Sequence, residues 1–526
     1  MVEVTVLVPF PYDEATVRRA VCEALPIRDD ELLSVTVRKE TLLTEDKPRL
    51  SYRLHVGVTA ARDKEEGLLK MRKKVRLVPS VSLLLPKKSP AVRPVVIGAG
   101  PCGLFCALAL AEAQARPILL ERGSRVEERS RSVDTFFRNG VLDEETNVAF
   151  GEGGAGTFSD GKLTFGTRDA YVEKVLATFI AHGAPPDIPY RSHPHVGTDR
   201  LVGIVRGIRQ RIEALGGEVR FDTRVTSIRE QDRHVQAVHT VDRYGREEEI
   251  PAHAVFLATG HSARDVYHML KTLGVRMEAK GFGVGVRIEH PAAWIDRLVF
   301  GGEQPRLGHA PYHLVTHLPN GRSVYSFCMC PGGQVICSSS EQGGIVTNGM
   351  SEYRRDADVS NAALLVSVTP EDFSSEDPLA GIAWQRSIER AAYQATGGFR
   401  APAVRLSDFL LGRVSESFGA VRPSFPLGTA MVPFSSFLPD FVIHSLQNGL
   451  RSFDEWLPGY AYVDAVLTGP ETRTTSPVRV VRDAATLESV TLHGLYPCGE
   501  GAGYGGGIVS SAVDGLRAAQ TYLLSL

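Results

Sequence analysis

The segment VVIGAGPCG at residues 95–103 constrains the fold of this chain more than any other feature of its sequence. It begins as an apolar strand and runs into a glycine turn, and an apolar helix follows over 104–113. A second apolar strand, PILLER, then ends at Glu121 and Arg122. A strand, a helix and a strand in this order predict a βαβ unit with a buried parallel sheet. The turn has the GxGxxG spacing of a Rossmann-type nucleotide-binding domain, formed by Gly98, Gly100 and Gly103.

Each glycine of this turn has a physical role in binding a dinucleotide. The first, Gly98, allows the tight turn, and the second, Gly100, lets the backbone approach the pyrophosphate. The third, Gly103, lets the helix and the strand pack closely, while the helix N-terminus faces the phosphates. Glu121 is predicted to accept hydrogen bonds from the ribose hydroxyls, and Arg122 is assigned to the same site.

The motif alone does not separate FAD from NAD, but two segments far downstream favour FAD. One is a buried strand that ends in ATG at 258–260, and the other is the glycine-rich turn before the last helix, 498–507. An extended FAD needs a carboxylate near its ribityl chain and a helix N-terminus near the pyrimidine edge of the flavin. Glu500 fits the first role, although such a turn could also serve close packing alone. The other residues assigned to FAD here are Thr259, Gly260, Gly499, Gly505, Gly506, Gly507 and Ile508.

The chain is expected to divide into three domains, because its 526 residues are too many for one ordinary core. Residues 1–88 have the periodicities of an N-terminal ferredoxin-like βαββαβ domain. The segment 86–94, rich in proline and lysine, is predicted to be an exposed connection. An α/β FAD-binding domain takes 89–270 and returns at 481–526, and an inserted α+β substrate domain takes 271–480.

Charge and cysteine content argue against several classes of protein. With 59 basic and 61 acidic residues, no global field marks nucleic acid or an anionic membrane as a partner, and nucleic acid is not expected. Seven cysteines are too few, and odd in number, for a disulfide framework, which favours a reducing compartment. The N-terminus lacks the pattern of a secretory signal, and no stretch approaches the roughly 20 apolar residues of a membrane span. The expected location is the cytoplasm.

Several longer stretches resemble one family of bacterial and plastid flavoproteins. They are NVAFGEGGAGTFSDGKL (147–163), FLATGHSARDVYHML (256–270), GVGVRIEHP (283–291), FCMCPGG (327–333), ETRTTSPVRVVR (471–482) and GLYPCGEGAGYGGGIVSSAVDG (494–515). From about residue 90 to its end the chain resembles the uncharacterised FAD-dependent, or NAD(FAD)-utilising, dehydrogenases. Its N-terminal part resembles the leading domain of that family. A minor departure is Gly505, where the family pattern leads us to expect alanine.

This resemblance implies a Rossmann-type FAD-binding domain (GR2-like) of the class that includes geranylgeranyl reductases and flavin hydroxylases. It also implies a substrate domain inserted before the last FAD-binding segment, but no particular substrate. In that class the glycine loop after the first βαβ unit borders the cofactor. The resemblance therefore implies cofactor contacts from Gly153, Gly154, Ala155, Gly156 and Thr157, with Ser159, Asp160 and Lys162 nearby. The same similarity places Val225 near the adenine.

Candidates for the chemistry itself are fewer. Cys328 and Cys330 form a CxC pair on a predicted strand, whose alternation points both side chains to one face. A thiol beside the flavin could act as an acid or as a redox partner, but two small buried residues would give the same pattern. His261, just after the ATG turn, is either a proton donor or a hydrogen-bonding residue. The spacing of the CxC pair and Cys337 does not fit a zinc site, so no metal is expected.

Two further groups of polar residues lie where strands should meet the substrate domain. They are Arg287, Glu289 and His290 in one segment, and Glu471, Arg473, Thr474, Ser476 and Arg479 in the other. The histidine of the first group is either a proton donor or a hydrogen-bonding residue. The side chains of the second group could line the same cleft or form a structural ion-pair network. The sequence does not decide between the two.

The sequence predicts an FAD-dependent oxidoreductase that passes hydride between flavin and a small organic substrate, with reduction or dehydrogenation of a carbon–carbon bond favoured. No second GxGxxG strand–helix unit is present, so NAD(P)H is expected at most as a transient electron donor. Three alternatives stay open: a flavin-dependent monooxygenase, a flavin-dependent RNA-modifying enzyme, and a flavoprotein that binds without turnover. The basic stretch 71–76 would contact RNA in the second, although neighbouring acidic residues favour a solvated face.

Overall fold

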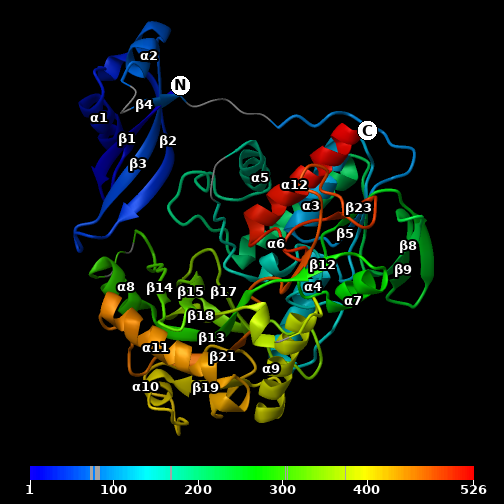
Figure 1. Ribbon diagram of the computed structural model, residues 1–526. Helices are drawn as coiled ribbons and strands as arrows, with labels where there is room; N and C mark the ends of the chain where they lie inside the picture. The colour runs from blue at the N-terminus through cyan, green and yellow to red at the C-terminus, as the bar shows by residue number, and fades with distance from the viewer. Residues whose placement is uncertain (72–74, 78–82, 166–168, 303, 305, 374) are drawn as a thin grey trace.

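The computed structural model describes the chain except residues 72–74, 78–82, 166–168, 303, 305 and 374. Figure 1 shows a small N-terminal unit to one side of two larger units that pack against each other. The basic stretch 71–76 falls partly outside the described residues. Within the described part of the chain, no helix is long and apolar enough to cross a membrane.

The N-terminal unit is an antiparallel sheet covered by helices. Its elements are β1 (Val2–Pro9), α1 (Glu14–Ala24), β2 (Leu32–Leu43), β3 (Ser51–Ala60), α2 (Arg62–Leu69) and β4 (Val75–Leu77), with a 3₁₀ turn at Asp29–Glu31. They follow the predicted βαββαβ order, and the strands pair as β2-β3-β1-β4. Alternate residues of β1 are buried, as a period of two requires. The Asp13 side chain accepts a hydrogen bond from the Thr16 amide and so caps the start of α1.

The second unit, called here the parallel-sheet unit, is assembled from distant parts of the chain. Its strands are β5 (Val95–Ile97), β6 (Ile118–Leu120), β7 (Glu218–Arg220), β11 (Val255–Leu257) and β23 (Leu495–Pro497). They pair in parallel in the order β23-β11-β5-β6-β7, which confirms the predicted Rossmann-type fold. The strands β5, β6, β11 and β23 are buried throughout, as expected for strands with both faces covered.

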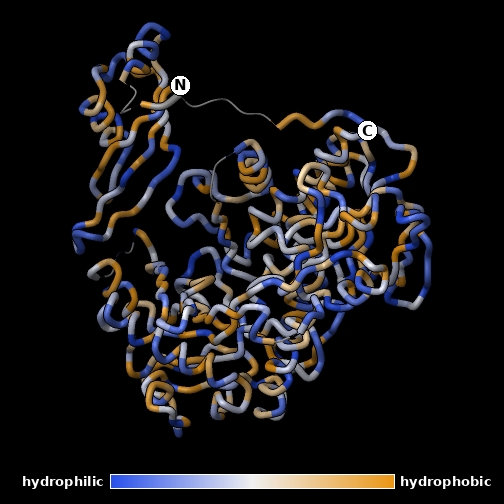
Figure 2. The backbone as a smooth tube through the Cα atoms, in the orientation of Figure 1, coloured by the Kyte–Doolittle hydropathy of each residue, from blue (hydrophilic) through white to orange (hydrophobic). Residues whose placement is uncertain are grey.

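Helices cover this sheet, and a β-meander lies at its edge. The helices α3 (Pro101–Glu112) and α12 (Ile508–Ser525) lie side by side. Burial of α3 from Cys102 to Ala111 explains why this helix is apolar all round. The other elements are α4 (Val126–Asn139), α5 (Ala170–Ala181), α6 (Thr198–Ala214), β8 (Thr223–Gln231), β9 (His234–Asp242), β10 (Glu247–Pro251) and α7 (Arg264–Thr272), with a 3₁₀ turn at Ala155–Phe158. Figure 2 shows the outer β8–β9 hairpin as largely hydrophilic.

The third unit, residues 277–480, contains a seven-stranded sheet of order β14-β15-β18-β13-β21-β19-β20. These strands are β13 (Phe282–Pro291), β14 (Val315–His317), β15 (Ser323–Cys330), β18 (Val359–Val368), β19 (Ala401–Arg405), β20 (Thr429–Ala430) and β21 (Val466–Glu471). Two small ribbons pair β12 (Met277–Ala279) with β22 (Val478–Val480), and β16 (Gln334–Cys337) with β17 (Thr347–Met350). The helices are α8 (Ala292–Phe300), α9 (Ala380–Thr396), α10 (Leu406–Leu410) and α11 (Asp440–Trp456), with 3₁₀ turns at Pro370–Phe373 and Phe434–Ser436.

Separate hydrophobic cores support the proposed division into domains. Val284, Leu364 and Leu450 belong to a core between the large sheet and α11, whereas α3 and α12 share a different core. The chain enters the third unit through β12 and leaves it through β22, and these two strands pair with each other. This pairing supports boundaries near residues 271 and 480, which remain a proposal.

Candidate functional site

A cavity lies at the carboxyl ends of β5, β6 and β11, between the parallel-sheet unit and the third unit. Ligands of open α/β sheets bind at this edge, because the turns after the strands and the helix N-termini meet there. The turn after β5 contributes Gly100, the end of β6 contributes Glu121, and the turn after β11 contributes Thr259. The third unit closes the opposite side with residues from β15, β17 and β21.

Most of the predicted site residues line this cavity. Those that do are Gly98, Gly100, Glu121, Arg122, Gly154, Ala155, Gly156, Val225, Thr259, Gly260, His261, Cys328, Glu500, Gly507 and Ile508. The predicted residues outside its lining are Gly103, Gly153, Thr157, Cys330, Gly499, Gly505 and Gly506. Of the residues considered with less definite roles, Ser159, Asp160, Lys162, Glu471, Arg473 and Thr474 also line it. Glu289 and His290 do not, because both are fully buried within the third unit.

The three glycines of the GxGxxG turn have different surroundings. Gly98 has a φ of +100°, and a Cβ there would lie 2.5 Å from the carbonyl oxygen of Ala258. A Cβ on Gly103 would collide with the carbonyl oxygen of Gly98, because α3 packs directly on this turn. A Cβ on Gly100 would meet only the Cα of Gly154, at 3.8 Å. The backbone at Gly100 is therefore the part of the turn that a ligand can approach.

The shape and polarity of the cavity fit a dinucleotide. No atom lies within 4 Å of a Cβ built on Gly260 or on Gly507, so the wall is recessed at both turns. The N-termini of α3 and α12 open on the same cavity, at Gly100–Pro101 and at Gly507–Ile508. Helix N-termini carry partial positive charge and unpaired amides, which stabilise phosphates and anionic rings. These residues fit an extended FAD.

The carboxylate of Glu121 is held by backbone amides. It accepts hydrogen bonds from Ala99 at 2.7 Å, Gly123 at 3.0 Å and Gly151 at 2.9 Å. Such charge-assisted bonds offset the cost of burying the carboxylate and fix it at the cavity wall. Glu121 therefore joins the GxGxxG turn to the glycine loop at 147–157. A carboxylate has about four acceptor positions, so three amides leave about one for a ligand in the cavity.

The guanidinium of Arg122 is fixed beside this carboxylate. It donates to Glu145 at 2.7 Å and to Asp265 at 3.0 Å, and it lies 4.4 Å from the ring centroid of Phe150. A stacked and doubly paired guanidinium offers a rigid, flat surface rather than a free charge. Its side chain forms part of the cavity wall together with Val225.

The glycine loop is held in place by charged residues that the sequence analysis missed. Arg129, which is fully buried, donates to the carbonyl oxygens of Asn147 at 2.9 Å, Val148 at 2.9 Å and Glu152 at 2.6 Å. The Glu152 carboxylate is buried too and is paired with Arg209 at 2.8 Å. No local pattern marks these side chains, because arginine and glutamate on a helix or in a loop are usually solvent-exposed. Only the tertiary structure shows that they shape the loop.

Glu500 is the carboxylate at the other helix N-terminus. Burial raises its pKa to about 7, although the Gly507 amide and the positive charge of Lys280 oppose that rise. The side chain lines the cavity next to the start of α12. A carboxylate with this pKa accepts hydrogen bonds when ionised and can donate one when protonated.

Ionisable side chains of the third unit form the opposite wall of the cavity, and Arg287 binds several of the residues in this wall. This guanidinium is fully buried and donates to Glu471 at 2.8 Å, to Asn348 at 2.8 Å and to the carbonyl oxygen of Cys328 at 2.8 Å. All three of these partners line the cavity, whereas Arg287 does not. Arg287 therefore supports the wall from behind, and Glu471 both lines the cleft and belongs to an ion pair.

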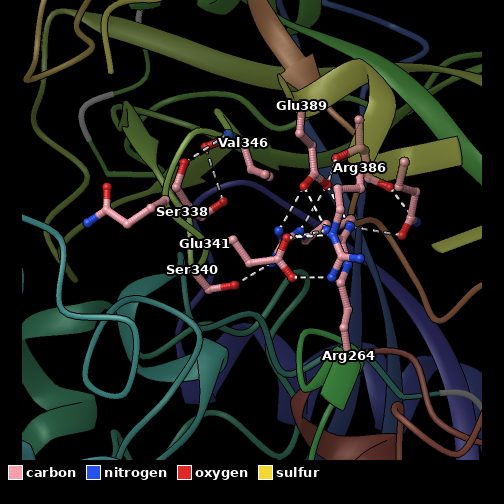
Figure 3. Close-up of polar contacts among 12 residues, drawn as sticks. Arg264, Ser338, Ser340, Glu341, Val346, Arg386 and Glu389 are labelled. Carbon is pink, nitrogen blue, oxygen red and sulfur yellow. Dashed lines mark hydrogen bonds and ion pairs between the residues drawn. The ribbon is translucent and has the colours of Figure 1, made fainter. Parts of the chain in front are cut away.

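A buried ion cluster lies behind His261. Figure 3 shows Arg264 between the carboxylates of Glu341 and Glu389, and Arg386 pairs with Glu341. Arg264 donates to Glu389 at 2.8 and 2.9 Å, and Arg473 binds the same carboxylate at 2.8 Å. Burial, followed by the charges of Arg473 and Arg264, lowers the pKa of His261 to about 4. The imidazole is therefore uncharged at neutral pH.

Comparison with known proteins agrees with this geometry. Residues 281–474 match the family described as FAD-dependent protein, C-terminal domain-like, and residues 92–287 match the pyridine nucleotide-disulphide oxidoreductases. An uncharacterized protein of Clostridium beijerinckii (strain ATCC 51743 / NCIMB 8052) is 41% identical over 520 residues, which cover 97% of this chain and 96% of that protein. The chain belongs to this family of FAD-dependent proteins. As a family member it is a flavin-dependent oxidoreductase with FAD as its cofactor, so the resemblance noted in its motifs is confirmed.

Two solved structures share lower similarity with this FAD-dependent protein. One is a geranylgeranyl bacteriochlorophyll reductase-like protein from Thermoplasma acidophilum, with 11% identity, a TM-score of 0.37, and coverage of 82% of this chain and 78% of that one. The other is a flavoprotein/dehydrogenase from Cytophaga hutchinsonii, with 12% identity, a TM-score of 0.36, and coverage of 82% and 79%.

Proposed function

We propose that this protein transfers hydride between FAD and a small organic molecule, and that it reduces or dehydrogenates a carbon–carbon bond. The observation that carries the proposal is the two-sided cavity. One side consists of glycine turns and helix N-termini, and the other consists of ionisable side chains of the third unit. Hydride transfer accompanied by proton transfer needs a cofactor-binding wall and a wall of titratable groups facing each other.

Residues of the parallel-sheet unit are proposed to hold FAD along its length. Glu121 and Val225 would bind the adenosine end, and Gly100 with the loop 154–156 would bind the pyrophosphate. Glu500 and the start of α12 would bind the ribityl chain and the flavin. When bound there, FAD supplies the hydride acceptor or donor.

The third unit is proposed to bind the substrate and to handle its proton. Phe327 lines the cavity and is 44% exposed, so its ring is available to a planar or apolar substrate. Lys162 from the parallel-sheet unit and Arg473 place positive charge on the wall, which favours a substrate with a carboxylate or a carbonyl group. The Cys328 thiol lies in the same wall and can hold or accept the proton that accompanies hydride transfer.

NADH or NADPH is proposed as a transient electron donor. The match of residues 92–287 to the pyridine nucleotide-disulphide oxidoreductases supports this assignment. The sequence has one βαβ unit with a GxGxxG turn, so a nicotinamide would bind for reduction and leave before the substrate enters.

An anaerobic absorbance spectrum of the purified protein, recorded before and after NADH or NADPH, tests the proposal. We expect a flavin spectrum that bleaches with one of the two nicotinamides, and FAD as the released cofactor by mass. A protein without FAD would overturn the proposal, and a flavin reduced by neither nicotinamide would overturn the donor. A hydroxylated product formed with oxygen uptake would establish the monooxygenase instead.

The Cys328→Ser variant tests the proposed proton handling. We expect unchanged flavin content and at least tenfold lower turnover, because a serine hydroxyl at the same place is a far weaker acid than a thiol. Cys337→Ser is the matched control, since the Cys337 thiol is buried beside Ser339 and does not line the cavity. Equal turnover of the two variants would remove Cys328 from the chemistry.

A further inference from the structure

Strand β15 is irregular at the point where it borders the cavity. Phe327 of β15 pairs with Ala363 of β18, and Cys330 pairs with Asn361. Between these two pairs β15 therefore has one residue more than β18. This β-bulge puts Cys328 at a φ of +41°, in the left-handed region that residues other than glycine rarely adopt. Backbone strain of this kind persists where surrounding contacts hold it, and it is concentrated at functional sites.

The bulge sets the two cysteines in different environments. Cys328 lines the cavity, whereas Cys330 is fully buried behind it. The Cys330 thiol donates to the carbonyl oxygen of Cys328 at 3.4 Å, and Arg287 donates to the same oxygen at 2.8 Å. The predicted alternation of one strand face is therefore interrupted at the bulge, and the Cys330 thiol contacts the backbone of Cys328.

The charges around the pair make one sulfur a nucleophile and leave the other a thiol. A hydrogen bond from the Cys330 thiol, together with the cations of Lys162 and Arg287, holds the pKa of Cys328 well below its usual value despite burial. The same hydrogen bond, with burial, raises the pKa of Cys330. A thiolate beside a protonated thiol is the form in which a dithiol reacts.

We propose that Cys328 and Cys330 are a redox-active pair that closes to a disulfide in the wall of the flavin cavity. Starting from the Cys328 thiolate, closure breaks the S–H bond of Cys330, forms one S–S bond and releases two electrons and one proton. The acceptor is a two-electron oxidant, which is either oxidised FAD in the same site or a small-molecule disulfide. The pair would thus be a second two-electron centre, in addition to the flavin, and this goes beyond the proposed hydride transfer to a substrate. The proposal rests on the proposed flavin site only where FAD is the electron acceptor.

Another pair of neighbouring thiols, Cys102 and Cys498, lacks the features that activate Cys328. A hydrogen bond with Cys498, together with burial, raises the pKa of Cys102. Among the described residues no cation opposes the rise at Cys102, so its sulfur stays protonated at neutral pH. The described structure therefore singles out Cys328 as the nucleophile.

Thiol counting on the full-length protein tests this inference. The protein is equilibrated anaerobically with mixtures of reduced and oxidised dithiothreitol, quenched with acid, denatured and assayed for free thiols. We expect seven thiols under reducing conditions, the number of free cysteines in the structure, and two fewer under oxidising conditions. Cys330→Ser should keep six thiols throughout, whereas the control Cys337→Ser should still lose two.

Peptide mass identifies the bond that forms. Trypsin cleavage after Arg322 and Arg354 releases one peptide that contains Cys328, Cys330 and Cys337. In the Cys337→Ser background this peptide should become lighter by two hydrogen atoms on oxidation. Seven thiols at every redox ratio, or a bond between Cys102 and Cys498, would overturn the assignment.

Reductive titration of the holoprotein with dithionite gives the second readout. The native protein, first oxidised, should consume twice as many electrons per flavin as Cys330→Ser. Equal consumption by the two proteins would contradict electron exchange between the pair and the flavin. A protein that carries no flavin would refute the proposed function but would leave the thiol count as an independent answer.

Discussion

The carboxylates of the cavity wall differ in how their charge is balanced. Glu121 accepts three backbone amides, and Glu471 is paired with the buried guanidinium of Arg287. Glu500 has no such guanidinium partner among the described residues. Burial raises the pKa of Glu471 and of Glu500 alike to about 7, against the charge of Arg287 at Glu471 and against the Gly507 amide and the charge of Lys280 at Glu500. Because an ionised carboxylate is costly to bury without a partner, Glu500 destabilises the unliganded protein at neutral and alkaline pH.

Gly100→Val is expected to abolish FAD binding while the protein stays folded. The valine would occupy the side from which a pyrophosphate approaches, yet its Cβ would meet no protein atom closer than 3.8 Å. The φ of −75° at Gly100 suits any residue, so the backbone is not strained. The ratio of flavin to protein absorbance measures the effect.

Gly203→Val is the control, because Gly203 lies at an exposed position of α6 and a Cβ there would have no described atom within 4 Å. Full flavin occupancy in Gly100→Val would show that the cofactor lies elsewhere.

Glu500→Gln is expected to stabilise the apoprotein in a pH-dependent way. The folded pKa of about 7 lies above the unfolded value of about 4.3, so ionisation costs stability as pH rises between these values. The variant should gain about 1–3 kcal/mol at pH 8 and nothing near pH 4, measured by denaturant unfolding. The exposed Glu455→Gln serves as control. A gain that did not depend on pH would contradict the assignment.

At the scale of elements, the carboxylate of Glu389 in α9 links the third unit to the cavity wall. Arg264 is the first residue of α7, directly after the cavity-lining turn 258–263. Arg473 follows β21 and lines the cavity. Both guanidiniums bind Glu389, so α7, α9 and the end of β21 meet at one buried charge. The relative position of the two walls therefore depends on this cluster.

Glu389→Gln is expected to lower stability by about 3–5 kcal/mol, because it leaves two buried guanidiniums without their shared partner. Burial alone would raise the pKa of Glu389, but Arg473 and Arg264 outweigh it and hold the pKa at about 2. The contribution is thus complete above the unfolded pKa of about 4.3 and is lost as pH falls toward 2. Denaturant unfolding at several pH values measures it.

The matched control for this prediction is Glu66→Gln in α2. Glu66 pairs with Arg62 at 3.1 Å on an exposed helix surface, and such pairs contribute about 1 kcal/mol or less. A loss in Glu389→Gln no larger than in this control, or one that stays constant from pH 7 to pH 3, would contradict the role of the cluster.

At the scale of the whole molecule, the loop that contains Ser192 links the N-terminal unit to the cavity wall. Glu40 of β2 is buried and accepts hydrogen bonds from the Ser192 amide at 3.1 Å and from Tyr12 at 2.7 Å. Three residues beyond Ser192, His195 pairs by backbone with Lys162, which lines the cavity. The N-terminal unit can therefore support the position of Lys162, although the two are far apart in sequence.

Glu40→Ala is expected to loosen this contact. Loss of the acceptor should speed amide hydrogen exchange at least tenfold in peptides covering residues 187–195, because the Ser192 amide loses its partner. Exchange mass spectrometry of the full chain measures this, with Glu66→Ala as control. Exchange in the C-terminal helix 508–525 should stay unchanged. Equal protection of 187–195 in both variants would show that the loop does not depend on Glu40.

Short-range spacing was sufficient to predict the parallel-sheet fold and most of the turns that line the cavity. Gly98, Gly100 and Gly103 belong to one turn, so their roles depend on contacts over a few residues and can be predicted from the local sequence. The same holds for the start of α1 at Asp13 and for the glycines before α12. A period of two identified β1, but it could not foresee the bulge at Cys328, which arises from pairing with β18.

The sequence by itself therefore determined the nucleotide-binding architecture and the candidate residues, because backbone geometry at glycine turns depends on neighbours in the chain. The tertiary structure alone decided which charged residues are buried and what balances them. Arg129, Arg287 and Glu389 carry no local signal, since a charged side chain becomes structural only when distant segments exclude water from it. The same long-range packing brought Cys328 into the wall opposite the glycine turns and set Glu40 against the loop that reaches Lys162.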